Sequence, residues 1–190
     1  QTFIQAELSL DGLLKNKKWT AATEQTGDFG KKPAAIIVDV DETVFDNAAF
    51  QARLVQDNAT FNEDAWNDWC EEAKAAAIPG ALAFLQKAAA KGVTVFYVTN
   101  RGTEVEEFTR QNLTALGFPM TDKFDVVLTK QEKPEWSSDK TPRRQAVAET
   151  HRIVMMFGDN LGDFVGSGKG TIDERNAVGA THNDKWGRGW

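Results

Sequence analysis

Residues 36–47 read IIVDVDETVFDN. The first three residues are apolar and β-branched, which is typical of a strand buried on both faces of a parallel sheet. The apolar run ends in carboxylates, since Asp39 and Asp41 come first and Glu42 and Asp46 follow within a few positions. A buried carboxylate is costly unless it has a partner. The stretch therefore predicts a buried strand whose end carries acidic residues that need a cationic partner.

Apolar runs and amphipathic segments alternate along the rest of the chain. Strands are expected at about 34–40, 93–99, 124–129 and 153–157. Helices are expected at about 1–18, 81–92, 103–117 and 141–152. Strands that alternate with helices imply βαβ crossovers. We therefore predict an α/β fold in one domain over residues 1–190, with a Rossmann-like parallel sheet flanked by helices.

Three local features refine this organisation. Residues 47–79 are helical in character and too long for a simple connection, so we expect them to form a small helical cap inserted after the first strand. The helix over residues 1–18 is expected to pack with this cap. Farther along, Thr103 and Glu106 have the spacing of a capping box, and Gly117 is placed to end the helix that they begin.

Polar residues follow three of the predicted strands. Asp39, Thr99 and Asp159 each come at or just after a carboxyl end, where open parallel sheets bind their ligands. Asp41 lies two residues after Asp39, and Asp163 lies four residues after Asp159. Two carboxylate clusters that face one site would repel each other without a cation, and hard oxygen ligands of this kind suit Mg²⁺. The alternative, that these acids cap helices or solvate loops, fits one aspartate better than two clusters.

Such a site has the groups that phosphoryl transfer requires. With Mg²⁺ present, a carboxylate can attack phosphorus and form an aspartyl-phosphate. The leaving group needs an acid, and Asp41 can supply the proton. The Thr99 hydroxyl can hold a phosphoryl oxygen. Lys140 can do the same, because it comes just before a predicted helix start, where backbone N–H groups favour anions.

Four motifs in order carry a resemblance to a known family. DVDET (39–43), VTNR (98–101), SDKTPRR (138–144) and GDNLGD (158–163) together resemble the motifs of the haloacid dehalogenase superfamily. VDVDETVFDN with FYVTNR resembles more narrowly the bacterial class C acid phosphatases, the lipoprotein 5′-nucleotidase group. The resemblance covers nearly the whole chain. It implies the haloacid dehalogenase fold and an acid phosphatase that hydrolyses phosphate monoesters, including 5′-nucleotides.

The resemblance also implies roles for the residues within these motifs. Asp39 would be the nucleophile, and Asp41 would be the general acid and base. Thr99 and Lys140 would bind the phosphoryl group, with Asn100 beside them.

The metal ligands implied by the resemblance come from the same motifs. Mg²⁺ would be bound by Asp39, by the backbone carbonyl of Asp41 and by Asp159. Asp163 would act through a bound water.

Other motif residues receive supporting or recognition roles. Arg101 follows Thr99 in the family pattern and is expected to support the site. Trp66 falls where the family has its base-stacking aromatic residue, whereas Trp69 is expected to anchor the cap to the core; core packing of both indoles is the alternative. The basic pair Arg143-Arg144 is expected on a solvated face or beside nearby acids.

Composition excludes several classes of protein. The net charge of −6 argues against a general nucleic-acid binder. Cys70 is the only cysteine, so an internal disulfide is impossible, and we expect it to be a small buried hydrophobe. No apolar run is long enough to span a bilayer.

The resemblance implies a secretory or lipoprotein signal ahead of Gln1. We therefore expect a periplasmic or outer-membrane protein whose membrane contact is a lipid anchor. A homodimer is possible.

Alternative functions remain on the same scaffold. A phosphomutase of this superfamily would need a cap that shuts out water. A storage or binding protein is the non-enzyme alternative, and plant storage proteins that resemble this group lack the first aspartate, which is present here as Asp39. A dehalogenase is disfavoured because that reaction has no leaving alcohol to accept the proton that Asp41 can give.

Overall fold

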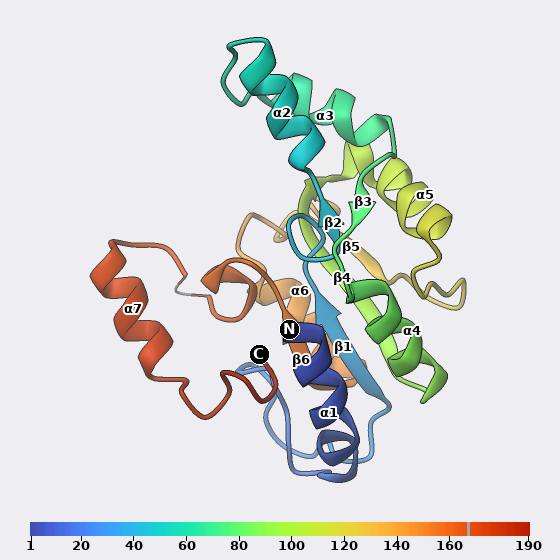
Figure 1. Cartoon of the computed structure of the whole chain (residues 1–190). Helices are drawn as coiled ribbons and strands as arrows, with labels where there is room; N and C mark the ends of the chain where they lie inside the picture. Colours follow the sequence, from blue (N-terminus) through green and yellow to red (C-terminus); the bar gives the residue numbers. More distant parts are fainter. Residues whose placement is uncertain (167) are drawn as a thin grey trace.

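The computed structural model describes residues 1–166 and 168–190. Its centre is a four-stranded sheet in the order β5-β4-β1-β6, in which every neighbouring pair is parallel (Figure 1). The strands are β1 (Ala34–Val38), β4 (Thr94–Gly102), β5 (Val127–Lys130) and β6 (Arg152–Phe157). The predicted α/β fold with a parallel sheet is therefore confirmed. All four predicted strands are present, although β4 runs three residues beyond its predicted end and β5 begins three residues late.

Helices cover both faces of the sheet. Helices α1 and α4 lie in front of it in Figure 1, and α6 lies behind it, where it contacts β6 and β4. Helix α5 contacts β5 and leads from β4 into it. Their bounds are α1 (Thr2–Lys15), α4 (Ala81–Ala90), α5 (Glu106–Leu116) and α6 (Thr141–Thr150). Because all four strands of this sheet are parallel, their carboxyl ends meet at one edge of the sheet.

The position of α1 differs from our expectation. It packs against α4 and β6 rather than with the cap. The Phe3 ring lies 5.9 Å from Phe84 of α4 and 5.3 Å from Phe157 of β6. The guanidinium of Arg152 donates to four backbone carbonyls at and just beyond the end of α1, those of Leu13, Leu14, Asn16 and Trp19. These contacts are with distant parts of the sequence, so the local pattern of residues 1–18 does not reveal them.

The cap is built from two helices on a small antiparallel sheet. Helices α2 (Ala48–Gln56) and α3 (Glu63–Glu71) lie between β2 (Phe45–Asp46) and β3 (Ala76–Ala77). The pairing of β2 with β3 was not predicted, and it closes the base of the insertion. In Figure 1 the cap projects beyond the carboxyl edge of the main sheet. It therefore stands over the place where the motif residues meet.

Two helix starts show how local signals compete with tertiary contacts. The predicted capping box of Thr103 is absent, because residues Thr103–Val105 form a 3₁₀ turn and α5 begins at Glu106. The Glu106 carboxylate instead accepts from Thr129 Oγ1 at 2.9 Å. The predicted end at Gly117 is correct, with φ of 85°.

Helix α7 (Ile172–Ala180) was not predicted, although the capping box between Thr171 and Glu174 is a sequence signal for it.

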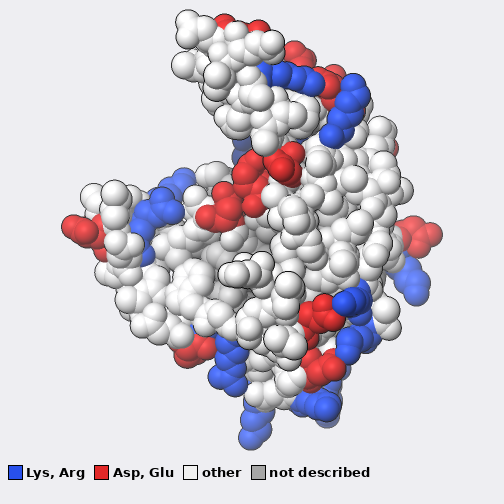
Figure 2. All heavy atoms as spheres, viewed as in Figure 1, with Lys and Arg blue, Asp and Glu red and all other residues white. Residues whose placement is uncertain are grey.

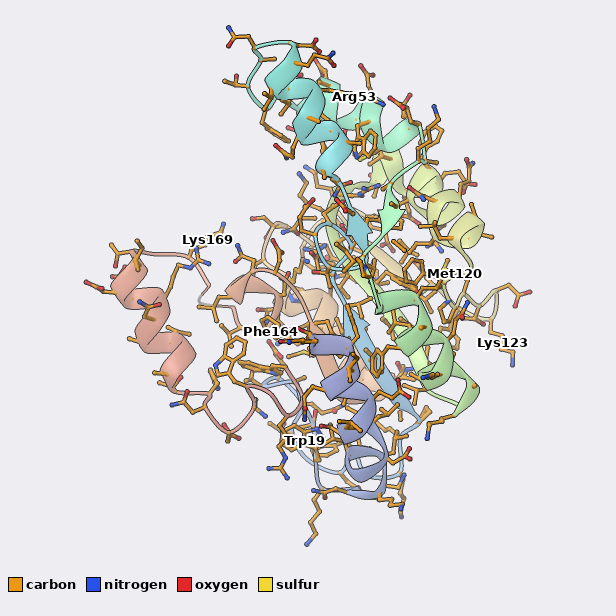
Figure 3. All side chains as sticks on the ribbon, in the orientation of Figure 1. Trp19, Arg53, Met120, Lys123, Phe164 and Lys169 are labelled. Atoms are coloured by element: carbon orange, nitrogen blue, oxygen red, sulfur yellow. The ribbon has the colours of Figure 1, made fainter. Side chains whose placement is uncertain are left out.

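Most of the six tryptophans belong to the core. Trp19, Trp69, Trp136 and Trp190 are buried, and Figure 3 shows Trp19 on the part of the body away from the cap. Trp186 is 40% exposed, and Trp66 is half-buried. Cys70 is buried, as expected. None of the helices in the described ranges has the length and apolar character of a membrane span.

Candidate active site

The acids of the two clusters meet at the carboxyl edge of the sheet. The backbone N–H of Asp39 donates to the carbonyl of Phe157 at 2.9 Å, which aligns the end of β1 with the end of β6. Asp39, Asp159 and Asp163 each offer a carboxylate oxygen, and these atoms all lie within 4.8 Å of one another. Figure 2 shows acidic side chains gathered in the hollow between the cap and the body. The structure thus brings the two predicted clusters together.

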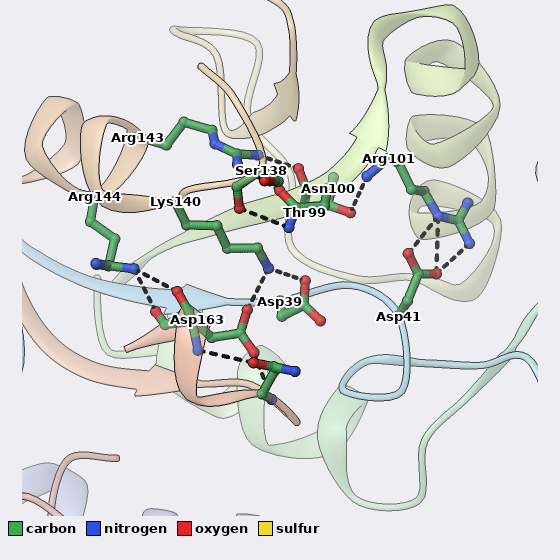
Figure 4. Close-up of polar contacts among 12 residues, drawn as sticks. Asp39, Asp41, Thr99, Asn100, Arg101, Ser138, Lys140, Arg143, Arg144 and Asp163 are labelled. Carbon is green, nitrogen blue, oxygen red and sulfur yellow. Dashed lines mark hydrogen bonds and ion pairs between the residues drawn. The ribbon is translucent and has the colours of Figure 1, made fainter. Parts of the chain in front are cut away.

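Lys140 supplies the local cation. Its Nζ bonds to Asp39 Oδ1 and lies 2.6 Å from Asp163 Oδ1, and the residue is only 4% exposed (Figure 4). Burial alone would lower the pKa of Lys140, but the attraction of Asp39 and Asp163 outweighs burial and raises it. Lys140 therefore stays charged beside the predicted nucleophile.

Burial changes the acidity of the carboxylates. It raises the pKa of Asp39 to about 7, helped by the charges of Asp163 and Asp41 and opposed by Lys140. The pKa of Asp159 is also raised, mainly by burial and then by Asp163. Asp39 and Asp163 are buried and Asp159 is exposed, but carboxyl groups this close together resist ionising together. A cation placed among them would relieve that repulsion.

This cluster fits a hard divalent cation. Mg²⁺ prefers oxygen ligands, and Asp39, Asp159 and Asp163 present three carboxylates within one small space. Asp39 and Asp163 are buried, so their charges have little water to screen them. Lys140 offsets only one of these charges.

Arg143 joins the carboxyl-terminal part of β4 to the loop before α6. Its guanidinium donates to the Thr99 carbonyl, to Asn100 Oδ1 at 2.7 Å and to the Ser137 carbonyl at 2.7 Å. Asn100 Nδ2 in turn donates to the Ser138 carbonyl at 3.1 Å. The Thr99 hydroxyl oxygen accepts the Arg101 backbone N–H at 3.1 Å, and the residue is fully buried. Thr99 and Asn100 thus lie beside the loop that leads into Lys140.

Arg144 supports the loop that carries Asp163. Its Nη1 donates to the carbonyls of Gly162 and Asp163 at 3.1 and 3.0 Å, and its Nη2 lies 2.5 Å from Glu24 Oε1. Asp163 Oδ2 also accepts the Asn160 backbone N–H at 2.9 Å. A Cβ atom at Gly158 would lie 2.2 Å from that same Oδ2, so only glycine leaves room for Asp163.

The fully buried pair Arg143 and Arg144 corrects our expectation of a solvated face. The alternative, a partner for nearby acids, holds for Arg144 through Glu24. Arginine is always charged and is rarely buried without partners, so sequence alone gives no reason to place it inside. The carbonyl, amide and carboxylate oxygens that meet in the fold make these positions favourable.

Asp41 has partners different from those of Asp39. Arg101 Nη2 donates to Asp41 Oδ1 at 2.7 Å, and Asn47 Nδ2 donates to the same oxygen at 3.0 Å. Our expectation of a supporting role for Arg101 named no partner, and Asn47 was not singled out. Asn47 lies within the DVDETVFDN stretch, but nothing in its spacing identifies Asp41 as its partner.

The two cap tryptophans have different environments. Trp69 is 3% exposed, and its indole N–H donates to Asn47 Oδ1 at 2.9 Å, so it joins α3 to the residue at which the cap begins. Trp66 is half-buried, and its ring lies 5.1 Å from Phe50 and 5.4 Å from the guanidinium carbon of Arg101. Trp66 therefore packs against Phe50 and Arg101 and still keeps part of its surface exposed.

A cavity of about 370 Å³ opens beside the acids. Asn100, Ser138 and Asp163 line it together with Asn160 and Arg175. A larger cavity of about 620 Å³ lies elsewhere, between the start of α1 and the last residues of the chain, and none of the motif residues lines it. The smaller cavity is therefore the one that adjoins the candidate site.

Comparison with known proteins agrees with this arrangement. The family model "HAD superfamily, subfamily IIIB (Acid phosphatase)" matches residues 6–181. Among solved structures, the class C acid phosphatase from Bacillus anthracis has a TM-score of 0.83 and 33% identity, covering 100% of this chain and 72% of that chain. A structure of class C acid phosphatase from Bacillus anthracis with tungstate bound has a TM-score of 0.84 and 34% identity, covering 100% of this chain and 73% of that chain.

Curated relatives are more distant. The stem 28 kDa glycoprotein of Glycine max is 22% identical over 138 residues, and a stem 31 kDa glycoprotein of the same plant is 24% identical over 135 residues. Each comparison covers 70% of this chain but only 54% and 53% of those proteins, so the chain spans about half the length of the curated relatives it matches. Because the family model covers most of its length, the chain belongs to subfamily IIIB of the HAD superfamily, the acid phosphatase subfamily.

Proposed function

We propose that the protein is a Mg²⁺-dependent acid phosphatase that hydrolyses phosphate monoesters, including 5′-nucleotides, through an aspartyl-phosphate on Asp39. One observation carries the proposal: Lys140 Nζ bonds to the carboxylates of both Asp39 and Asp163 at the carboxyl edge of the sheet. A buried ammonium beside a candidate nucleophile is suited to hold a phosphoryl oxygen next to the attacking atom.

Two steps complete the reaction. In the first, a carboxylate oxygen of Asp39 bonds to phosphorus, the bond to the leaving oxygen breaks, and Asp41 gives that oxygen its proton. In the second, Asp41 takes a proton from water, the water oxygen bonds to phosphorus, and the bond from phosphorus to the Asp39 oxygen breaks, which frees phosphate and the Asp39 carboxylate. Lys140 and Thr99 hold the phosphoryl oxygens throughout.

The carboxylate cluster is the proposed metal site. Asp39, Asp159 and the backbone carbonyl of Asp41 would hold Mg²⁺, with Asp163 acting through water. When bound, the ion supplies positive charge next to the transferring phosphoryl group. The cluster of three carboxylates supports this assignment.

Nucleotide recognition is assigned to the cap. A flat aromatic surface beside a phosphate site can stack a base, and stacking tolerates every base because each has a π-face. The partly open ring of Trp66 supports this role, and the 62% exposed ring of Phe61 lies 6.2 Å from it. The tungstate in the related Bacillus anthracis structure also supports an oxyanion site in this fold.

A phosphate-release assay tests the proposal. We expect release from a panel of phosphate esters that chelation abolishes and Mg²⁺ restores, with tungstate as a competitive inhibitor. Asp39→Asn should abolish turnover, because an amide cannot attack phosphorus. Near wild-type turnover by Asp39→Asn would rule out the covalent route, and activity that survives exhaustive chelation would rule out the metal.

A further inference from the structure

Asp41 has a different cationic partner from Asp39 and Asp163. Figure 4 shows its carboxylate pointing toward Arg101, whereas Lys140 bonds to Asp39 and Asp163. Arg101 Nη2 donates to Asp41 Oδ1 at 2.7 Å, and Arg101 Nε reaches Oδ1 and Oδ2 at 3.0 and 3.2 Å. A planar guanidinium that contacts both oxygens fixes the plane of a carboxylate as well as its position.

Arg101 is itself firmly held. Its side chain is 1% exposed, and Nη1 donates to Thr109 Oγ1 at 3.1 Å. The rings of Phe45 and Trp66 lie 5.2 and 5.4 Å from its guanidinium carbon, within the range of cation–π contact. The guanidinium thus has polar and aromatic partners from α5, from β2 and from the cap helix α3. It is a fixed reference against which Asp41 is oriented.

Asn47 gives a second hold whose direction is also set by the cap. The Trp69 indole can only donate, so Asn47 Oδ1 must face it, as the 2.9 Å contact shows. The Nδ2 of Asn47 is then turned to Asp41 Oδ1 at 3.0 Å and to Glu42 Oε1 at 3.1 Å. Asn47 is 1% exposed, so water does not compete for these bonds.

We propose that Arg101 and Asn47 are positioning residues that orient the Asp41 carboxylate and connect its orientation to the cap helix α3. The inference rests on the proposed function, because it takes Asp41 as the acid and base of that reaction. The Asp41 side chain is still 22% exposed, so the two residues clamp it without closing it off from a substrate.

The connection to the cap gives the arrangement a purpose beyond stability. Trp66 covers the same guanidinium that holds Asp41, and Trp69 orients the amide that holds it from the other side. A base stacked on Trp66 would therefore contact the same indole that packs on Arg101, and Arg101 orients the proton donor Asp41. Small errors in such an orientation are costly, because a displacement of about 1 Å can lower a rate by about a hundredfold.

The test compares Arg101→Gln with Asp41→Asn over a series of phosphate esters whose leaving groups range from dinitrophenol to simple alcohols. A good leaving group needs no acid, whereas a poor one does. We expect Arg101→Gln to lower kcat/KM, which reports only the step in which the leaving group departs, by about a hundredfold for alkyl esters and nucleotides and by less than about threefold for dinitrophenyl phosphate. The slope of log kcat/KM against leaving-group pKa should steepen in the same sense as for Asp41→Asn.

A double variant separates positioning from general damage. If Arg101 acts through Asp41, then Asp41→Asn with Arg101→Gln should be no slower than Asp41→Asn alone, within about twofold. Arg53→Gln is the matched control, because Arg53 also lies over a cap indole, 5.0 Å from the Trp69 ring centre, but its ion-pair partner is Glu72 on the cap (Figure 3 labels Arg53). That control should leave the slope unchanged.

Each failure has its own signature. Equal losses across all leaving groups, or losses that add in the double variant, would overturn the positioning role. A leaving-group slope that Asp41→Asn itself leaves unchanged would instead contradict Asp41 as the acid of the proposed function. If Arg101→Gln does not fold, Arg101→Lys, which keeps the charge but loses the fork, and Trp69→Phe, which removes only the indole N–H, should steepen the slope by smaller amounts. If neither variant changes the slope against leaving-group pKa, the inference is also overturned.

Discussion

Lys140 Nζ lies between the carboxylates of Asp39 and Asp163 and bonds to both. Asp39, just after β1, and Lys140, just before α6, are 101 positions apart in the chain. The contact makes Lys140 the local counter-charge of the acids, and in the proposed function Lys140 is also the phosphate-binding group. Its removal should therefore have two consequences that can be measured separately.

We expect Lys140→Met to lower kcat/KM by at least about a hundredfold, because it removes a fixed cation from the transferring phosphoryl group. The variant should also have a lower Tm in metal-free buffer, since the remaining carboxylates then repel one another. Mg²⁺ should restore part of that Tm but little of the activity. Thermal melts with and without Mg²⁺, beside a steady-state assay, check both statements.

The matched control is Lys91→Met, which removes an exposed lysine paired with Asp11 at 2.5 Å. Exposed pairs contribute little, so its Tm and activity should stay close to those of the wild type. A Tm of Lys140→Met that Mg²⁺ does not raise would contradict a shared role of the ammonium and the ion.

Arg144→Met should destabilise the fold by about 3–5 kcal/mol, because it leaves the buried Glu24 carboxylate without its cation. It also removes two donors from the carbonyls of Gly162 and Asp163. Adding Glu24→Gln should recover part of the loss, since no unpaired charge then remains. Urea unfolding of the wild type, both single variants and the double variant measures the coupling. Purely additive losses would show that the two side chains do not stabilise each other.

Local pattern was sufficient for the four strands of the main sheet and for the position of Asp39. Runs such as residues 36–38 and 153–157 are apolar throughout, and a parallel sheet buries such runs on both faces. Because parallel strands end at one edge, the sequence positions of Asp39, Thr99 and Asp159 predicted their common location. The motif order added expected roles for single residues, which charge and spacing alone could not distinguish.

Contacts between distant residues could not be predicted in this way. Arg101 and Asp41 are 60 positions apart, and nothing in either segment names the other. Arg152 is buried because four carbonyls near the end of α1 surround its guanidinium, a reason that exists only in the fold. The capping box at Thr103 failed for the same kind of reason, since Glu106 bonds to Thr129 instead.

Glu132 should make the stability of the fold depend on pH. Burial, then the charge of Asp125, raises the pKa of Glu132 from 4.5 to about 7 in the folded protein. Between these two values the folded state binds the proton that the unfolded state has lost, so this group's contribution to stability falls as pH rises from 4.5 to about 7.

Glu132→Gln removes this dependence. The Tm of the variant relative to the wild type should therefore rise from pH 4.5 to about pH 7 and stay level above that. The neighbouring exposed Glu135, replaced by Gln, is the matched control. Thermal melts across this pH range give the comparison, and a difference in Tm that does not change with pH would show that Glu132 is not the group responsible.

Trp66 provides the sharpest test of substrate recognition. Base stacking contributes about 1–3 kcal/mol per base, so Trp66→Ala should raise KM for 5′-nucleotides by about tenfold or more. A small aryl phosphate has no base to stack, and its KM and kcat should change much less. Steady-state kinetics with both substrates measure how much more KM rises for nucleotides than for the aryl phosphate.

Packing must be separated from recognition in this variant, because the Trp66 ring lies 5.1 Å from Phe50, and some loss of thermal stability is expected from the cavity that the truncation leaves. Trp186→Ala, which truncates a 40% exposed indole packed beside Phe164 rather than on the cap, controls for the loss of a tryptophan as such. A nucleotide-selective rise in KM that Trp186→Ala does not reproduce would assign Trp66 to the base. Equal losses for nucleotides and aryl phosphate, together with a lower Tm, would make Trp66 a packing residue and leave the proposed nucleotide specificity without its recognition element.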